Sequence, residues 1–217
     1  MKYKLAIFDM DGTILDTLED LCDCTNYALR MYNLPERSIE EIRHFLGNGI
    51  RKLIERAVPE GTTVEIVDQV FDTFKVYYKD HCAIKTRPYD GINDVIKKIR
   101  DNGIITAVVS NKADFAVGIL CEDYFKGLFD FSVGDKEGQR RKPYPDGVLS
   151  VLDRFGIDKK DAVYIGDSEV DFQTAQNAKL DVIMVGWGFR DEEFILSQGA
   201  EFVVKKPEEL LGYVLDK

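Results

Sequence analysis

The sequence contains few of the side chains that build disulfide frameworks or thiolate and imidazole metal sites. Its 217 residues include two histidines and four cysteines, and no two of the cysteines have CxxC spacing. Structural zinc sites and disulfide-stapled domains depend on such groups. We therefore expect reduced cysteines that pack in the interior, at Cys22, Cys24, Cys82 and Cys121, and structural or exposed histidines at His44 and His81.

Membrane and nucleic-acid signals are also missing. No apolar run approaches the roughly 20 residues that cross a bilayer, and the N-terminus lacks the basic and apolar parts of a signal peptide. The 39 acidic and 29 basic side chains give a formal net charge of −10. This charge disfavours non-specific binding to nucleic acid or to an anionic membrane, although a local basic pocket remains compatible with it. We expect a cytoplasmic protein without nucleic-acid or membrane partners, and we make no prediction about its oligomeric state.

Strand and helix patterns alternate from about residue 90 onward. Apolar runs predict strands at 4–9, 104–110, 128–133, 161–166, 182–185 and 201–204. Helical patterns lie at 92–101, 114–121, 145–155 and 170–178. Such alternation is typical of a parallel sheet with helices on both faces. The predicted fold class is α/β, with a Rossmann-like parallel sheet core.

A helical segment interrupts this pattern directly after the first strand. Residues 16–86 contain no convincing strand, whereas apolar residues recur at helical spacing around 18–32 and 64–78. Between these patterns, Ser38 to Glu41 has the form of a capping box. We expect residues 16–86 to form a helical domain inserted into an α/β core of residues 1–15 and 87–217.

Acidic residues follow two of the predicted strands. Asp9 and Asp11 end the first strand, and Asp167 and Asp171 follow the strand at 161–166. Ligands of open α/β sheets bind outside the carboxyl ends of the strands, and Gly12 lets the chain turn both nearby carboxylates toward one pocket. Clustered carboxylates repel one another unless a cation neutralises them. Because oxygen ligands without Cys or His clusters favour magnesium over zinc, the sequence predicts a Mg²⁺ site here.

Groups that suit an anion are expected at the same edge of the sheet. Mg²⁺ is most often held by one or two carboxylates together with phosphate oxygens, so a phosphate is the expected ligand. A cation and several donors could bind it, namely Lys142, Thr13, Ser110 and Asn111. Two other interpretations stay open: Lys142 could be a solvated cation, and Ser110 with Asn111 could cap a helix that starts near residue 112.

Four motifs together indicate a family. DMDGT, SN, KPYP and GDSEVD, in this order and at these strand ends, resemble the haloacid-dehalogenase superfamily of phosphotransferases. Over the whole chain, the phosphoglycolate-phosphatase-like enzymes are the most similar group. The resemblance implies that residues 16–86 are the helical cap of that family, and that the protein is a magnesium-dependent phosphatase acting on a small phosphate ester.

The same resemblance implies roles for individual residues. Asp9 would be the nucleophile that forms an aspartyl phosphate, and Asp11 would be the general acid and base. Magnesium would be held by Asp9, the backbone carbonyl of Asp11 and Asp167, with Asp171 reaching it directly or through water. The transferring phosphoryl group would be bound by Thr13, Ser110, Asn111 and Lys142.

Two other functions and one part of the site stay open. Sugar phosphomutases of the superfamily also carry both aspartates, and a non-enzymatic α/β module could use Asp9 only as a phosphorylation or metal site.

In the cap, Gly47, Asn48 and Arg51 resemble the glycine-rich segment that faces the active site in this family, where Asn48 and Arg51 would contact the leaving group. A simple turn between helices is the other interpretation of this segment. Trp187 is expected to be a packing residue.

Overall fold

The computed structural model describes residues 3–215, and the chain divides into two units. The core unit comprises Met1–Leu15 and Pro88–Lys217, and the inserted unit comprises Asp16–Arg87. The strands β2 (Leu15–Asp16) and β3 (Arg87–Pro88) pair where the chain passes from one unit to the other. Among the described residues, no helix is both long and apolar enough to cross a membrane.

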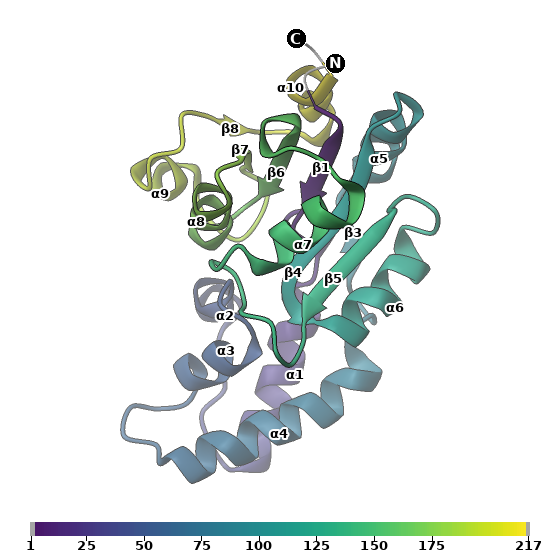
Figure 1. Ribbon diagram of the computed structural model, residues 1–217. Helices are drawn as coiled ribbons and strands as arrows, with labels where there is room; N and C mark the ends of the chain where they lie inside the picture. The colour runs from purple at the N-terminus through teal and green to yellow at the C-terminus, as the bar shows by residue number, and fades with distance from the viewer. Residues whose placement is uncertain (1–2, 216–217) are drawn as a thin grey trace. The chain divides into compact units, whose positions relative to one another are not determined.

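A six-stranded parallel sheet in the order β5-β4-β1-β6-β7-β8 forms the centre of the core unit (Figure 1). Its strands are β1 (Leu5–Phe8), β4 (Ile105–Ala113), β5 (Phe131–Asp135), β6 (Ala162–Gly166), β7 (Asp181–Val185) and β8 (Val203–Val204). In β1, Phe8 lies opposite Val108 of β4 and Ile165 of β6. The carboxyl ends of these three strands therefore meet at one edge of the sheet, which is where an open α/β sheet binds ligands.

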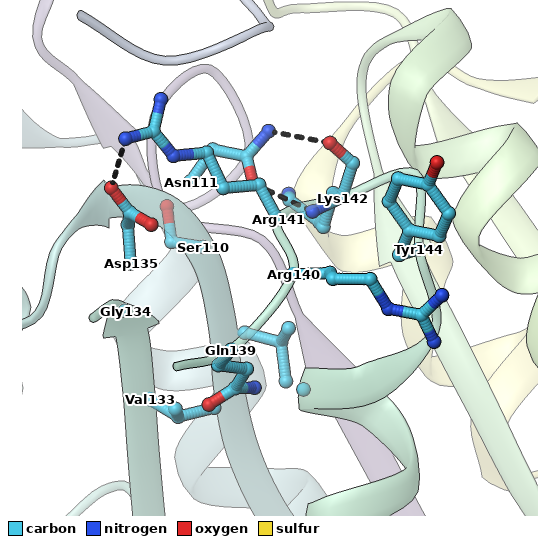
Figure 2. A pocket seen from close by; sticks show the side chains of 12 residues that line it. Ser110, Asn111, Val133, Gly134, Asp135, Gln139, Arg140, Arg141, Lys142 and Tyr144 are labelled. Atoms are coloured by element: carbon cyan, nitrogen blue, oxygen red, sulfur yellow. Dashed lines mark hydrogen bonds and ion pairs between the residues drawn. The ribbon is translucent and has the colours of Figure 1, made fainter. Parts of the chain in front are cut away.

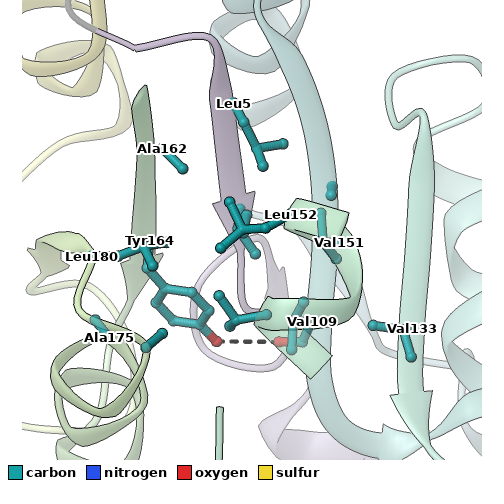
Figure 3. Packing of buried hydrophobic residues seen from close by; sticks show 13 residues of the cluster. Leu5, Val109, Val133, Val151, Leu152, Ala162, Tyr164, Ala175 and Leu180 are labelled. Atoms are coloured by element: carbon teal, nitrogen blue, oxygen red, sulfur yellow. Dashed lines mark hydrogen bonds between the residues drawn. The ribbon is translucent and has the colours of Figure 1, made fainter. Parts of the chain in front are cut away.

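Helices cover both faces of this sheet, which confirms the predicted α/β fold (Figure 1). The helices of the core unit are α5 (Ile92–Asp101), α6 (Asp114–Tyr124), α7 (Asp146–Phe155), α8 (Glu169–Ala178), α9 (Glu192–Ser197) and α10 (Leu210–Leu215). Two 3₁₀ turns lie at Lys159–Asp161 and Pro207–Glu209. On one face, Leu5 of β1, Val151 of α7 and Ala175 of α8 belong to one buried cluster (Figure 3). Each such fully buried Leu or Val side chain contributes about 1.5–3 kcal/mol to folding.

The strand β4 extends further than its apolar run predicts. The run ends at Ser110, but the strand continues to Ala113, and its register with β5 shifts between Val109 and Ala113. The helix α6 begins only at Asp114, without a side-chain cap. The interpretation of Ser110 and Asn111 as a helix N-cap is therefore wrong. A bulge of this kind re-aims side chains at the end of a strand.

The inserted unit is helical, with α1 (Leu18–Met31), α2 (Ile39–Phe45), α3 (Ile50–Ala57) and α4 (Val64–His81). The capping box predicted at Ser38 is present: the Ser38 hydroxyl accepts from the Glu41 amide, and Glu41 accepts from the Ser38 amide. The rings of Tyr27 on α1 and Tyr77 on α4 stack with centroids 3.7 Å apart. The stacked rings connect α1 to α4, whereas the capping box fixes the start of α2.

A buried carboxylate that the patterns do not reveal holds the end of the inserted unit in place. Asp20, on α1, accepts hydrogen bonds from the backbone amides of Ile84, Lys85 and Thr86. The segment that follows α4 therefore has its amides satisfied by one side chain from the start of the unit, as buried backbone groups require. None of the four cysteines, all of which lie in the described part of the chain, forms a disulfide, and Cys22, Cys24 and Cys82 are buried.

Candidate active site

Three carboxylates of the core unit converge at the centre of the sheet edge. Asp9 follows β1, and Asp167 and Asp171 follow the adjacent strand β6; one oxygen of each lies within 4.8 Å of the others. All three are buried. Burial, and then the charge of Asp171, raise the pKa of Asp9 to about 7, and the same causes raise the pKa of Asp167 well above its usual range. Three such groups are stable as carboxylates only beside a cation.

The donor set fits a hard divalent cation. Asp9 Oδ1 is buried and forms no hydrogen bond with any described residue, although Lys142 Nζ lies 2.8 Å away as an ion-pair partner. An oxygen in this state is suited to a metal ion, and an all-oxygen site selects magnesium or calcium over zinc.

Lys142 lies between two of the carboxylates. Its Nζ is 2.8 Å from Asp9 Oδ1 and 2.7 Å from Asp171 Oδ1. Burial alone would lower the pKa of this lysine, but the charges of Asp171 and Asp9 raise it well above its usual range. The interpretation of Lys142 as a solvated cation is wrong, because its side chain is 4% exposed, whereas Arg140 and Arg141 beside it face solvent.

Asn111 fixes the backbone of this lysine (Figure 2). Its Nδ2 donates to the Lys142 carbonyl oxygen at 3.1 Å, and its Oδ1 accepts from the Lys142 amide at 2.8 Å. Ser110 is buried next to it, and its hydroxyl accepts from the amide of Lys112. Ser110 and Asn111, the two predicted phosphate-binding residues of β4, line one pocket with Lys142 (Figure 2). The Asn111 side chain is already hydrogen-bonded to the Lys142 backbone.

Tyr164, on β6, completes the contacts of Lys142 and was not among the sequence candidates. Its hydroxyl lies 3.1 Å from Lys142 Nζ, 3.1 Å from Asp171 Oδ1 and 3.2 Å from the carbonyl oxygen of Val109. Figure 3 shows its ring in the core and its hydroxyl at the edge of that core. The signal that could have revealed it is a tyrosine within an otherwise apolar strand, because a buried phenol needs a partner.

Asp171 is engaged on both of its oxygens. Oδ1 contacts Lys142 and Tyr164. Oδ2 accepts from the Ser168 amide at 3.1 Å, in the capping box that begins α8, and from the Ser168 hydroxyl at 2.6 Å. A Cβ at Gly166 would lie 2.3 Å from the Asp171 Cβ, so this close approach requires glycine. Asp171 is therefore well placed to orient Lys142, whether or not it also contacts a metal.

Asp167 is oriented by the turn after β1 and by the loop after β7. The Thr13 hydroxyl donates to Asp167 Oδ1 at 2.9 Å, and the Phe189 amide donates to Oδ2 at 2.8 Å. In the same loop, Trp187 Nε1 donates to the Thr13 carbonyl oxygen at 3.0 Å. Trp187 thus does more than the packing expected of it, and Thr13 supports a carboxylate directly.

Asp11 lies apart from the three clustered side chains. Its Oδ1 accepts from Lys112 Nζ at 2.8 Å, and the Lys112 side chain is 1% exposed. Lys112 was not among the sequence candidates, because it falls just beyond the predicted strand end. With Lys112 and Lys142, the site holds two ammonium groups against four carboxylates. One divalent cation would balance the remaining charge.

The three cap candidates lie in the inserted unit. Gly47 and Gly49 have positive φ angles, so the segment between α2 and α3 is a turn that needs glycine. The Asn48 side chain accepts from Arg56 at 2.8 Å. Arg51 forms ion pairs with Glu55 and Asp68 and lies over the ring of Phe71. Its guanidinium therefore already has two acidic partners within this unit.

Comparison with known proteins identifies the family. The model of the haloacid dehalogenase-like hydrolases matches residues 6–185. The N-acetylmuramic acid 6-phosphate phosphatase of Pseudomonas aeruginosa is 31% identical, over 100% of this chain and 96% of that protein. The phosphoglycolate phosphatase of Psychrobacter arcticus is 33% identical, over 87% of this chain and 86% of that protein.

A solved structure agrees over the full length. The crystal structure of a protein predicted to be a phosphoglycolate phosphatase, from Lactobacillus delbrueckii subsp. bulgaricus, is 41% identical with a TM-score of 0.95, and the match covers 100% of both chains. The family match spans all four motifs and the inserted unit. The chain therefore belongs to the haloacid dehalogenase-like hydrolases, in which its relatives are phosphoric monoester hydrolases, and this confirms the predicted family and enzyme class.

Proposed function

We propose that the protein is a Mg²⁺-dependent phosphatase that hydrolyses a small phosphate ester through an aspartyl phosphate on Asp9. The observation that carries the proposal is the state of Asp9, a buried carboxylate clustered with Asp167 and Asp171. Its Oδ1 is ion-paired with Lys142 and forms no hydrogen bond with the described residues. A carboxylate held in this way is a competent nucleophile toward a phosphoryl group once its charge is offset.

Asp9, Asp167 and the backbone carbonyl of Asp11 would hold the metal, with Asp171 contributing directly or through water. When bound, Mg²⁺ neutralises the carboxylates and the phosphoryl oxygens so that two anions can approach each other. Lys142 offsets further charge on the phosphoryl group from the side of Asp9 and Asp171. Thr13, Ser110 and Asn111 complete the phosphoryl-binding edge.

The reaction has two displacements. Asp9 attacks phosphorus, the bond from phosphorus to the ester oxygen breaks, and Asp11 gives its proton to the departing oxygen. Water then attacks phosphorus, gives a proton to Asp11, and the bond to Asp9 breaks to release phosphate and restore both aspartates. General acid–base catalysis of this kind contributes about 10²- to 10⁴-fold to the rate.

The inserted unit selects the substrate in this proposal. The relatives named above act on N-acetylmuramic acid 6-phosphate and on phosphoglycolate, which supports a small phosphorylated metabolite. Gly47, Asn48 and Arg51 are the candidates to contact its leaving group. Because Arg51 is paired with Glu55 and Asp68, an anionic leaving group would have to compete with these acids for it.

A substrate panel tests the proposal. It contains 4-nitrophenyl phosphate, 2-phosphoglycolate, N-acetylmuramic acid 6-phosphate, sugar phosphates and nucleoside monophosphates, each with Mg²⁺ and with EDTA. We expect hydrolysis that needs Mg²⁺ and that falls at least about 1000-fold in Asp9→Asn. Asp153→Asn, an exposed aspartate on α7, is the matched control.

Two results would count against the proposal. Turnover that persists in Asp9→Asn, or that needs no divalent metal, would sink the mechanism. Isomerised sugar phosphate that appears faster than free phosphate would replace the hydrolase by a mutase.

A further inference from the structure

A second buried lysine accompanies one of the proposed catalytic carboxylates, and the mechanism above gives it no role. Lys112 Nζ lies 2.8 Å from Asp11 Oδ1, with 1% of the lysine side chain and 21% of the aspartate side chain exposed. Burial of an ammonium group is unfavourable unless a partner compensates it. Asp11 supplies that compensation, so each side chain restrains the other.

The backbone explains how Lys112 comes to face the turn after β1. β4 lies next to β1 in the sheet, and Asp11 follows β1. A regular strand would alternate its side chains between the two faces. Because the register shifts between Val109 and Ala113, residues 110–112 depart from this alternation. The bulge that brings Asn111 to Lys142 also brings the next residue to Asp11.

We infer that Lys112 is a positioning residue that holds the Asp11 carboxylate where it exchanges protons with the leaving group and with water. The inference rests on the proposed function. Lys112 engages Oδ1, and a proton transfer needs only one carboxylate oxygen, which is then Oδ2. Without the ion pair, the partly exposed Asp11 side chain gains other rotamers, and a displacement of about 1 Å is enough to slow a reaction strongly.

Two esters with different leaving groups test this role. The fastest alkyl phosphate of the panel releases an alkoxide, which needs a proton, whereas 2,4-dinitrophenyl phosphate releases a stable phenolate, which does not. In Lys112→Met we expect kcat/KM for the alkyl ester to fall about 10- to 100-fold, and kcat/KM for the aryl ester to change less than about threefold. A selective loss for the alkyl ester therefore reports on the proton transfer to the leaving group, which is the step that depends on the position of Asp11.

Three further variants complete the test. Lys112→Arg keeps the charge and should recover part of the alkyl-ester rate. In an Asp11→Asn background, Lys112→Met should change kcat/KM by less than about twofold, because the lysine acts through Asp11. Lys97→Met removes an exposed lysine that pairs with Asp101 on α5 at 2.6 Å, and it should leave both esters unaffected. If thermal melts show that Lys112→Met does not fold, Lys112→Gln takes its place.

The outcomes separate the inference from the proposed function. Equal losses for both esters, or a further loss of about tenfold in the Asp11→Asn background, would overturn the role of Lys112 while leaving the phosphatase intact. A wild-type protein that hydrolyses neither ester with Mg²⁺ overturns the proposed function, and this inference with it.

Discussion

The side-chain amide of Asn111 pairs with both backbone polar groups of Lys142, donating to the carbonyl oxygen and accepting from the amide. The two hydrogen bonds connect the end of β4 to the loop before α7. Lys142 is therefore held at its backbone as well as at its ammonium group, which lies between Asp9 and Asp171. Because its backbone and its ammonium group are both held, Lys142 can offset negative charge at the site without moving during a reaction.

Asn111→Ala should release this loop. It leaves two buried backbone groups without partners, each at a cost of about 1–3 kcal/mol, so we expect the free energy of unfolding to fall by about 2 kcal/mol in urea titrations. The loss of position at Lys142 should lower kcat/KM for 4-nitrophenyl phosphate about 10- to 100-fold. Asn102→Ala, at the exposed end of α5, is the control. If Asn111→Ala keeps full activity, the ammonium contacts suffice to place Lys142.

Tyr164→Phe removes one oxygen from the same network and preserves the packing of the ring. Lys142 Nζ loses an acceptor, and Asp171 Oδ1 and the Val109 carbonyl oxygen lose the hydroxyl that can donate to either of them. We expect the free energy of unfolding to fall by about 1–2 kcal/mol, and kcat to fall about 3- to 10-fold while KM changes little. Tyr144→Phe, at a tyrosine that is 53% exposed, is the matched control. Equal behaviour of the two variants would contradict a positioning role for the Tyr164 hydroxyl.

Magnesium should stabilise the protein more at high pH than at low pH. Burial and the charge of Asp171 raise the pKa of Asp9 to about 7, whereas in the unfolded chain it is about 4. Between these values the metal-free folded state binds more protons than the unfolded state, so this group destabilises the fold progressively as the pH rises. Mg²⁺ binds the ionised form and removes that cost. The rise of Tm caused by Mg²⁺ should therefore be larger near pH 8 than near pH 5.

Thermal unfolding at several pH values, with MgCl₂ and with NaCl of equal ionic strength, measures this difference. Comparison at each pH cancels the carboxyl groups outside the metal site, which titrate in the same way in both salts. The pKa of Asp167 is raised by the same causes as that of Asp9, so its contribution has the same direction. Asp9→Asn should show a much weaker pH dependence of the Mg²⁺ effect. An equal rise of Tm at both ends of the range would show that Asp9 takes no part in metal binding.

Gly188→Ala should disturb the support of Asp167. The added Cβ would lie 2.3 Å from the Gly12 carbonyl oxygen and 2.4 Å from the Asp167 Cβ, and neither group can move without displacing the carboxylate. We expect the free energy of unfolding to fall by about 1–3 kcal/mol, and Mg²⁺ binding to weaken in calorimetric titrations. Gly118→Ala in α6 is the control, because nothing lies within 4 Å of its new Cβ. That substitution should stabilise the helix by about 0.5–1 kcal/mol, and a similar gain at Gly188 would refute the close packing described here.

Most of the core unit is predictable from local patterns, because its strands are short apolar runs and its helices are amphipathic. The predicted ranges for β6 and for α7 differ from the observed ones by one residue at one end. There are exceptions: β5 is observed at Phe131–Asp135 instead of 128–133, β4 ends at Ala113 instead of Ser110, and α9 and α10 fall where no helix is predicted. The added residues of β4 include Asn111 and Lys112, whose partners, Lys142 and Asp11, lie far away in the sequence. Hydropathy along the chain carries no information about such partners.

The candidate site likewise contains some residues that the sequence predicts and others that it does not. Asp9, Asp167 and Lys142 stand at recognisable strand ends or in recognisable motifs, and the structure brings them together. Tyr164 and Lys112 act through single atoms whose partners depend on the register of three strands. A buried tyrosine in an apolar strand reveals that its hydroxyl has a partner, but not which one.

Trp187 is the single tryptophan of the chain, and its indole N–H is bonded to the carbonyl oxygen of Thr13. The only indole fluorophore of the protein is thus attached to the turn that carries Asp11 and supports Asp167. Emission from an indole depends on its hydrogen bond and its exposure, so any ligand that moves this turn should change the spectrum. The protein carries its own optical probe, and titrations with metal or phosphate need no added label.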